Sequence, residues 1–112
     1  MNFLANRNIL LGITGSIAAY KSAELARLFI KAGANVRVIM SEEAKRFIAP
    51  LTFEAITGNE VLHVKTESWS NDANHIHITK WAECFVIATA TANTIKKLAH
   101  GFADNLLLQS AL

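Results

Sequence analysis

The fold is decided by residues 8–21, which read NILLGITGSIAAYK. The apolar run 9–13 predicts a strand that is covered on both faces. It ends at Gly15 and Ser16, and apolar residues at helical spacing begin at Ile17. Such a corner directs backbone N–H groups and the positive end of a helix dipole toward one place, so it predicts a phosphate site. A plain connection between strand and helix, the more common role of such corners, is the alternative.

The next residues complete a βαβ unit. Apolar residues recur at helical spacing from Ile17 to Ala32, charged residues lie largely off this stripe, and Gly33 follows as a helix stop. Residues 36–40 then predict a second strand. A strand, a helix and a strand within about 32 residues form such a unit, whose crossover is right-handed in nearly all proteins.

The later chain adds further strands and helices. Pro50 permits the start of a helix that continues to Gly58. The remaining expected elements are a short strand at 61–64, a polar loop at 67–74, a helix or turn at 75–82, a strand at 85–88, a corner at 89–93 and a helix at 94–99. We expect all strands to be parallel, which gives an α/β fold with an incomplete doubly wound sheet in which the first and fourth strands are neighbours.

Composition narrows the class of protein. A chain of 112 residues with 52% hydrophobic and 18% charged residues fits one well-packed domain. The net charge of +2 comes from scattered basic residues and predicts no nucleic-acid partner. No apolar run reaches membrane-spanning length, and the first residues do not resemble a signal peptide. The single cysteine, Cys84, excludes a disulfide framework and predicts a reducing, cytoplasmic setting, and its apolar neighbours predict that it is buried.

Small and polar residues follow the predicted strands, at the edge where open α/β sheets bind ligands. Ser41 follows the second strand, where it either caps the next helix or also lines the crevice. Small residues at Gly15 and in the corner 89–93 would let a flat ligand approach the backbone. The spacing of Gly12 and Gly15 is neither the dinucleotide fingerprint nor a P-loop, which leaves a mononucleotide such as FMN.

His75 and His77 follow the polar loop. No cluster of further ligands accompanies them in the sequence, so they do not predict a metal site. His75 is either a solvated loop residue or, at the mouth of the crevice, a group that transfers protons near neutral pH.

Sequence motifs are distributed along nearly the whole chain: GITGSIAAYK at 12–21, MSEEAKRFI at 40–48, HIHITKWA at 75–82, ATATANTI at 88–95 and HGFADNLL at 100–107. In this order they resemble the motifs of the homo-oligomeric flavin-containing cysteine decarboxylases. Within that family they are most similar to the enzymes that decarboxylate phosphopantothenoylcysteine.

The resemblance implies a Rossmann-like three-layer flavoprotein fold with a parallel sheet, bound FMN, and trimers or dodecamers built from trimers. It implies a small-molecule substrate, 4'-phosphopantothenoylcysteine, whose thiol is oxidised by the flavin before carbon dioxide is lost and pantetheine 4'-phosphate is formed. FMN-binding roles are implied for Gly15, Ser16, Ile17, Ser41, Ala90, Thr91 and Ala92, and a catalytic role as base for His75. Ser16 would hold the phosphate, Ser41 would contact FMN, and Thr91 would lie at the edge of the isoalloxazine ring.

The chain departs from the family pattern in some places. Thr89 stands where the family has proline, which leaves the corner an N–H group and a freer φ. The printed sequence ends at Leu112, before the family's Pro-x-Met-Asn segment and its cysteine-bearing flap. We therefore expect residues 1–112 to be an FMN-binding domain that lacks the C-terminal substrate-binding segments, with a C-terminally incomplete sheet, and not to decarboxylate alone. A non-catalytic flavin-binding or oligomer-forming remnant and a flavin prenyltransferase relative are the alternatives.

Overall fold

Strand β1 (Asn8–Ile13) lies inside a parallel sheet whose strand order is β3-β2-β1-β4. The computed structural model describes residues 3–15, 17–63, 78, 80–88 and 99. The other strands are β2 (Asn35–Met40), β3 (Leu62–His63) and β4 (Cys84–Ile87), and all of the pairings are parallel. The predicted parallel sheet, with its first and fourth strands as neighbours, is confirmed.

Both faces of β1 are covered, which explains its unbroken run of apolar residues. Leu11 and Ile13 belong to a core cluster on the side of the helices, and Leu10 belongs to a smaller cluster on the opposite face. All three side chains are buried. Ile78, from the short helical turn before β4, is fully buried in the second cluster, so this turn contributes to covering the face that the helices leave open.

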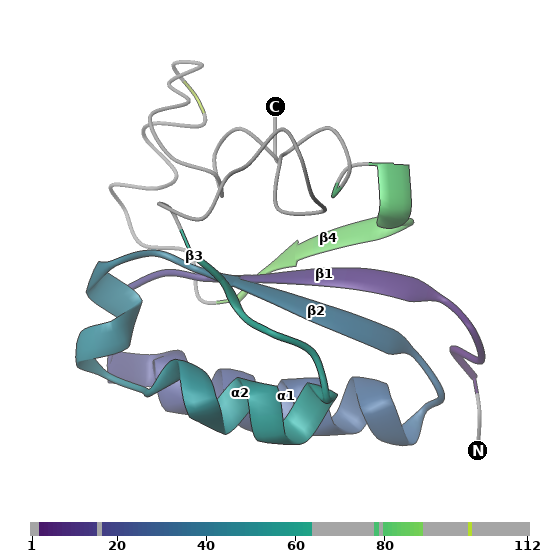
Figure 1. Cartoon of the computed structure of the whole chain (residues 1–112), viewed down its shortest axis with the longest axis horizontal. Helices are drawn as coiled ribbons and strands as arrows, with labels where there is room; N and C mark the ends of the chain where they lie inside the picture. The colour runs from purple at the N-terminus through teal and green to yellow at the C-terminus, as the bar shows by residue number, and fades with distance from the viewer. Residues whose placement is uncertain (1–2, 16, 64–77, 79, 89–98, 100–112) are drawn as a thin grey trace.

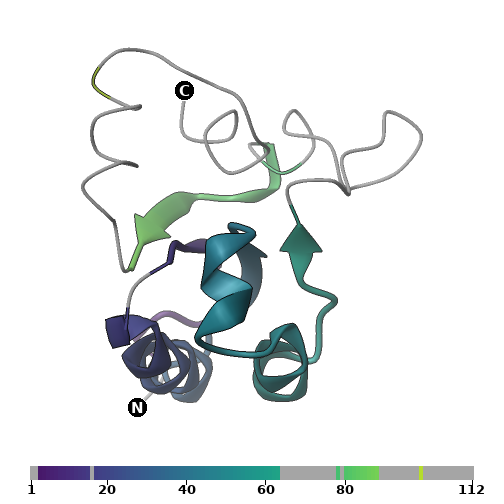
Figure 2. The same ribbon diagram turned by 90° about the vertical axis from the view of Figure 1, so that its left-hand side faces the viewer.

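Two helices lie side by side on one face of the sheet (Figure 1). The first begins as the 3-10 turn η1 (Ile17–Ala19) and continues as α1 (Tyr20–Lys31), and the second is α2 (Pro50–Thr57). A view from the end of the sheet places both helices below the strands (Figure 2). The expected helix from residue 17 is confirmed, although its first turn is 3-10 rather than α.

Local signals fix the ends of these helices. Pro50 occupies the first turn of α2, where its missing N–H group has no intrahelical partner to lose. Gly58 ends the helix in the left-handed region, with φ of 74°, and donates its N–H to Glu54. Gly33 follows α1 with φ of 95°. The predicted helix stops at both glycines are therefore confirmed.

The predicted burial of Cys84 is wrong, because the residue is exposed. Cys84 is the first residue of β4, which is one of the two outer strands of the described sheet and pairs with β1 on one side. The residues after it, Phe85 to Ile87, do pack against the two core clusters. The apolar run therefore predicts the strand correctly, but the first residue of that strand is not buried.

The core of the helix layer depends on Phe53 of α2, which is 0% exposed. We predict that Phe53→Ala lowers the free energy of unfolding by about 3–5 kcal/mol, because it removes buried apolar surface and leaves a cavity. Urea denaturation followed by circular dichroism measures this. Leu51→Ala, at a position 71% exposed in the same helix, is the matched control. It should change the free energy of unfolding by no more than about 0.5 kcal/mol; equal losses in both variants would contradict the prediction.

Candidate functional site

The predicted site lies where β1, β2 and β4 end. Because these strands are parallel and adjacent, their carboxyl ends meet at one edge of the sheet, with the end of β1 in the middle (Figure 1). Gly15 and Ile17 follow β1, and Ser41 follows β2. The structure thus brings Gly15, Ile17 and Ser41 to the same edge.

Other predicted site residues fall outside the described part of the chain. These are His75, Ser16, Ala90, Thr91 and Ala92, together with His77. Their roles remain predictions from the sequence. The elements that lead into them, namely β1, β4 and the turn at Ile78 to Trp81, are described.

The corner after β1 has the composition of an anion site. Neither η1 nor the first turn of α1 contains an acidic residue, and no side chain caps α1 at Ala19. A carboxylate in this turn would compete for the backbone N–H groups and repel a phosphate. Ile17 is 80% exposed, so the start of the turn faces outward rather than into the core.

Gly15 is required here for space. A Cβ atom built on Gly15 would lie 2.5 Å from Cβ of Glu43 and 3.2 Å from its carbonyl carbon. Gly15 is not among the described glycines with positive φ, so backbone conformation alone does not require glycine. The sequence predicted that a small residue here lets a ligand approach the backbone, which remains a prediction. The structure adds that the space a Cβ atom would need is filled by the corner after β2.

Ser41 acts as the cap that the sequence predicted. Its Oγ accepts a hydrogen bond from the N–H of Ala44 at 3.3 Å, in the turn η2 (Glu43–Arg46). Its own N–H donates to the carbonyl of Ile13 at 3.0 Å, which continues the β1–β2 pairing by one step. A serine hydroxyl that accepts one hydrogen bond still has a proton to donate. The capping role is therefore chemically compatible with a second role toward a ligand.

Ser22 is a structural residue of this edge that the sequence analysis missed. It is 2% exposed, and its Oγ donates to the carbonyl of Ala88 at 2.8 Å. Ala88 follows β4 and directly precedes the corner 89–93, so this bond fastens α1 to the start of that corner. A signal was available, because Ala19, Ser22 and Ala26 form one buried stripe at helical spacing, and a serine there needs a partner.

The turn before β4 is fastened at the opposite edge of the sheet. Asn8 Nδ2 donates to the carbonyl of Trp81 at 3.0 Å, and the Arg37 guanidinium lies 5.9 Å from the Trp81 ring centroid. Arg7 and Glu83 form an exposed ion pair at 2.9 Å. The hydrogen bond from Arg7, followed by that from the Asn8 N–H, lowers the pKa of Glu83 below its usual value.

The described residues form neither a metal-binding cluster nor a membrane-spanning helix. No group of three or more histidine, cysteine or acidic side chains there could hold a metal ion. Within the same part of the chain, no helix has the length and hydropathy needed to cross a membrane.

We predict that Ser22→Ala lowers the free energy of unfolding by about 1–3 kcal/mol, because the carbonyl of Ala88 loses its buried donor. Chemical denaturation measures this. Thr52→Ala, which removes an exposed hydroxyl from α2, is the control and should change stability by no more than about 0.5 kcal/mol. A Ser22→Ala variant as stable as the parent would show that the bond contributes nothing.

Comparisons with known proteins agree with the fold. A family model described as Flavoprotein matches residues 2–112. The chain is 46% identical over 111 residues to the coenzyme A biosynthesis bifunctional protein CoaBC of Bacillus subtilis (strain 168), covering 97% of this chain and 27% of that protein. It is 46% identical over 107 residues to the probable phosphopantothenoylcysteine decarboxylase of Streptococcus mutans serotype c, covering 95% of this chain and 60% of that protein.

Among solved structures, that of the FMN-dependent cysteine decarboxylase SpaF superposes with a TM-score of 0.84 at 30% identity. The match covers 96% of this chain and 62% of SpaF. The predicted Rossmann-like α/β flavoprotein fold is therefore confirmed. The chain spans less than two thirds of each of these three proteins.

Proposed function

Because the chain belongs to the Flavoprotein family, we propose that it binds FMN at the edge formed by the carboxyl ends of β1, β2 and β4. The observation that carries this proposal is the family match over residues 2–112, and the strand order supports it by bringing Gly15, Ile17 and Ser41 to one edge. The FMN dependence of SpaF, which shares the fold at 30% identity, supports the choice of cofactor.

The described residues fit a phosphate and a flavin at this edge. Among the described residues, neither η1 nor the first turn of α1 contains an acidic residue that would compete for its N–H groups or repel a phosphate. We assign the phosphate to the backbone around Gly15, Ser16 and Ile17. The Ser41 hydroxyl, whose oxygen accepts from Ala44, would donate its proton to an acceptor atom of FMN.

We assign the flavin ring to Ala90, Thr91 and Ala92. This assignment comes from the sequence motif, and the described structure supports it at one point. The carbonyl of Ala88, two residues before Ala90, is held by Ser22, so the entry to the corner is fixed relative to α1. Small side chains in such a corner would let the ring approach the backbone closely.

We further propose that these residues belong to a decarboxylase of 4'-phosphopantothenoylcysteine, and that the product is pantetheine 4'-phosphate. The similarity to the Streptococcus mutans protein supports this substrate class. Bound FMN would supply the two-electron oxidation of the substrate thiol and the later return of the electrons. His75 would accept the proton that leaves during the oxidative step, a role suited to an imidazole near neutral pH.

A homo-oligomer, a trimer or a dodecamer of trimers, is the assembly that we propose, in a reducing cytoplasmic setting. The surface of the helix layer supports self-association. Ile17, Tyr20 and Leu28 are 80%, 60% and 52% exposed, and Tyr20 and Leu28 line an apolar groove beside Ile56 of α2. Exposed apolar surface of this kind is commonly covered in assemblies.

The first prediction from this proposal concerns FMN uptake. The purified chain should show the visible absorption of a bound flavin, or take up FMN on titration with quenching of flavin fluorescence. Ser41→Ala should weaken FMN binding by about 5–10-fold, since one hydrogen bond is lost. Ser41→Thr keeps the hydroxyl and should retain the affinity. A chain that neither contains nor takes up FMN would overturn the proposal.

The second prediction separates an enzyme from a binding module. In a chimera, residues 1–112 replace the matching part of the Streptococcus mutans protein. His75→Asn in this chimera should leave FMN affinity unchanged and reduce carbon dioxide release from 4'-phosphopantothenoylcysteine by at least ~100-fold, the usual contribution of a positioned base.

The chain alone is assayed in parallel, which tests the expectation that it needs the remaining residues of its relatives. Unchanged turnover in the His75→Asn chimera would exclude the proposed base. Prenyl transfer from dimethylallyl phosphate to the bound flavin, measured in the same preparations, would indicate the prenyltransferase alternative.

A further inference from the structure

We propose that Gly15 and Glu43 are paired positioning residues, whose close contact sets the corner after β1 against the corner after β2. The proposal rests on the proposed FMN site and adds to it the contact that holds two of its walls in place. Neither residue needs to touch FMN for this role. The positioning role follows from the close packing of the two corners and from the absence of a Cβ atom on Gly15.

The two corners leave the sheet side by side. Ile13 and Met40 are partners in the last step of the β1–β2 register, and the Ser41 N–H donates to the Ile13 carbonyl one step further. Gly15 stands two residues after Ile13, and Glu43 stands two residues after Ser41. The pairing of the strands thus continues into a contact between the corners.

The contact leaves no room for a side chain on Gly15. The nearest atoms to an added Cβ would be Cβ of Glu43 at 2.5 Å, its carbonyl carbon at 3.2 Å and its Cα at 3.4 Å. These atoms belong to the backbone or are attached to it, so rotation of the flexible end of Glu43 cannot relieve the overlap. One of the two corners would have to move.

The corner after β2 is firmly held, so it cannot yield cheaply. Ala44, the residue after Glu43, is 0% exposed within the main core cluster. Its N–H donates to the carbonyl of Ser41 at 3.2 Å and to the Ser41 Oγ at 3.3 Å. Glu42 adds an ion pair to Lys45 at 3.1 Å. A side chain on Gly15 would therefore displace the corner after β1, which carries the predicted phosphate contacts at Ser16 and Ile17.

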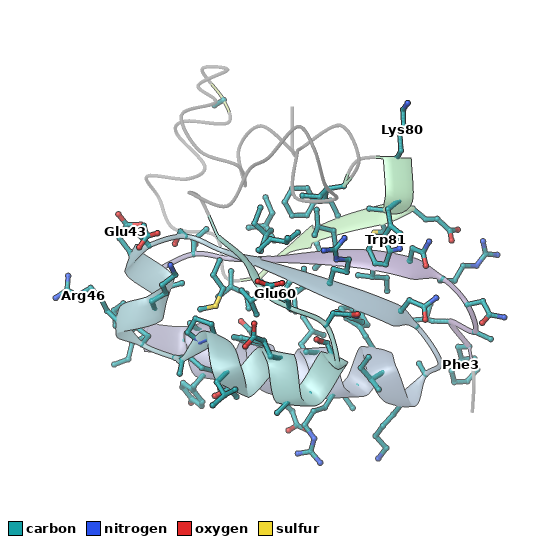
Figure 3. The ribbon with its side chains drawn as sticks, in the orientation of Figure 1. Phe3, Glu43, Arg46, Glu60, Lys80 and Trp81 are labelled. Carbon is teal, nitrogen blue, oxygen red and sulfur yellow. The ribbon has the colours of Figure 1, made fainter. Side chains whose placement is uncertain are left out.

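The carboxylate of Glu43 is not needed for this contact. Glu43 is exposed, and its side chain extends outward from the corner after β2 (Figure 3). The atom that matters is Cβ, which alanine retains and glycine lacks. The contact between the two corners can therefore be tested by adding a Cβ atom to Gly15 and removing the Cβ atom of residue 43.

The experiment compares Gly15→Ala, Glu43→Gly, Glu43→Ala and the double variants Gly15→Ala/Glu43→Gly and Gly15→Ala/Glu43→Ala, all in the full chain. FMN affinity is measured by fluorescence titration, and the unfolding midpoint is measured on the same samples. Gly15→Ala should weaken FMN binding by at least about tenfold. Adding Glu43→Gly should recover most of that loss, whereas adding Glu43→Ala should recover none, because alanine keeps the Cβ atom.

Phe53→Leu is the control that separates a general loss of stability from an effect on the two corners. It alters the core of α2 and should leave FMN affinity unchanged. Wild-type affinity in Gly15→Ala, or equal recovery in the two double variants, would overturn the proposal. Failure of the wild-type chain to take up FMN would overturn the proposed function instead. In that case the unfolding midpoints test the contact between the two corners. If Glu43→Gly restores the midpoint lost in Gly15→Ala and Glu43→Ala does not, the contact is supported. If the two double variants unfold at the same midpoint, the contact is contradicted.

Discussion

The structure depends on one constraint, which is that β1 is paired with a strand on each side and covered on each face. Its hydrogen bonds run to β2 and β4, and its side chains alternate between the two core clusters. A strand in this position can hardly shift without breaking pairings and exposing buried surface on both sides. The corner that follows it therefore leaves the sheet at a fixed point, between the ends of its neighbours.

Short contacts hold the corner after β1 in place relative to the residues that follow β2 and β4. On the side of β2, the Ser41 N–H bonds to the carbonyl of Ile13, and Gly15 packs against Glu43. On the side of β4, Ser22 bonds to the carbonyl of Ala88. The first contacts are made by backbone and the last by a buried hydroxyl, so none relies on a long, mobile side chain. Among the described residues, the ends of β1, β2 and β4 are thus held in place without a ligand, and such pre-organisation lowers the ordering cost of binding.

The sequence was sufficient to predict those elements that depend on the local pattern of residues. Apolar runs located β1 and β2, helical spacing located α1, and Pro50 with Gly58 located α2. The parallel arrangement followed from the alternation of predicted strands and helices along the chain. The burial of Cys84 was predicted wrongly because cover depends on which strand lies beside a residue, and a run of apolar letters does not contain that information.

The candidate site shows where local pattern stops being informative. The sequence singled out Gly15 as a small residue beside a ligand, and the structure adds a second reason for glycine, because its neighbour in space is Glu43, which belongs to another corner. Only the register of β1 and β2 brings these residues together, and no spacing within either motif encodes it. Ser22 was overlooked for a related reason, since its partner Ala88 lies on a distant strand.

A glycine in a binding motif is usually explained either by the ligand or by the backbone conformation. Here a third explanation is sufficient, namely the close approach of two corners that follow paired strands. Positive φ at Gly33 and Gly58 marks glycines that end helices, and Gly15 is not among them. A replacement at Gly15 would thus act first on the fold of the edge and only through it on a ligand. Because Gly15 has no Cβ atom, the two corners can pack closely, and this packing holds the turn that would receive the phosphate. The fold of the edge and the binding of a ligand are therefore coupled at this residue.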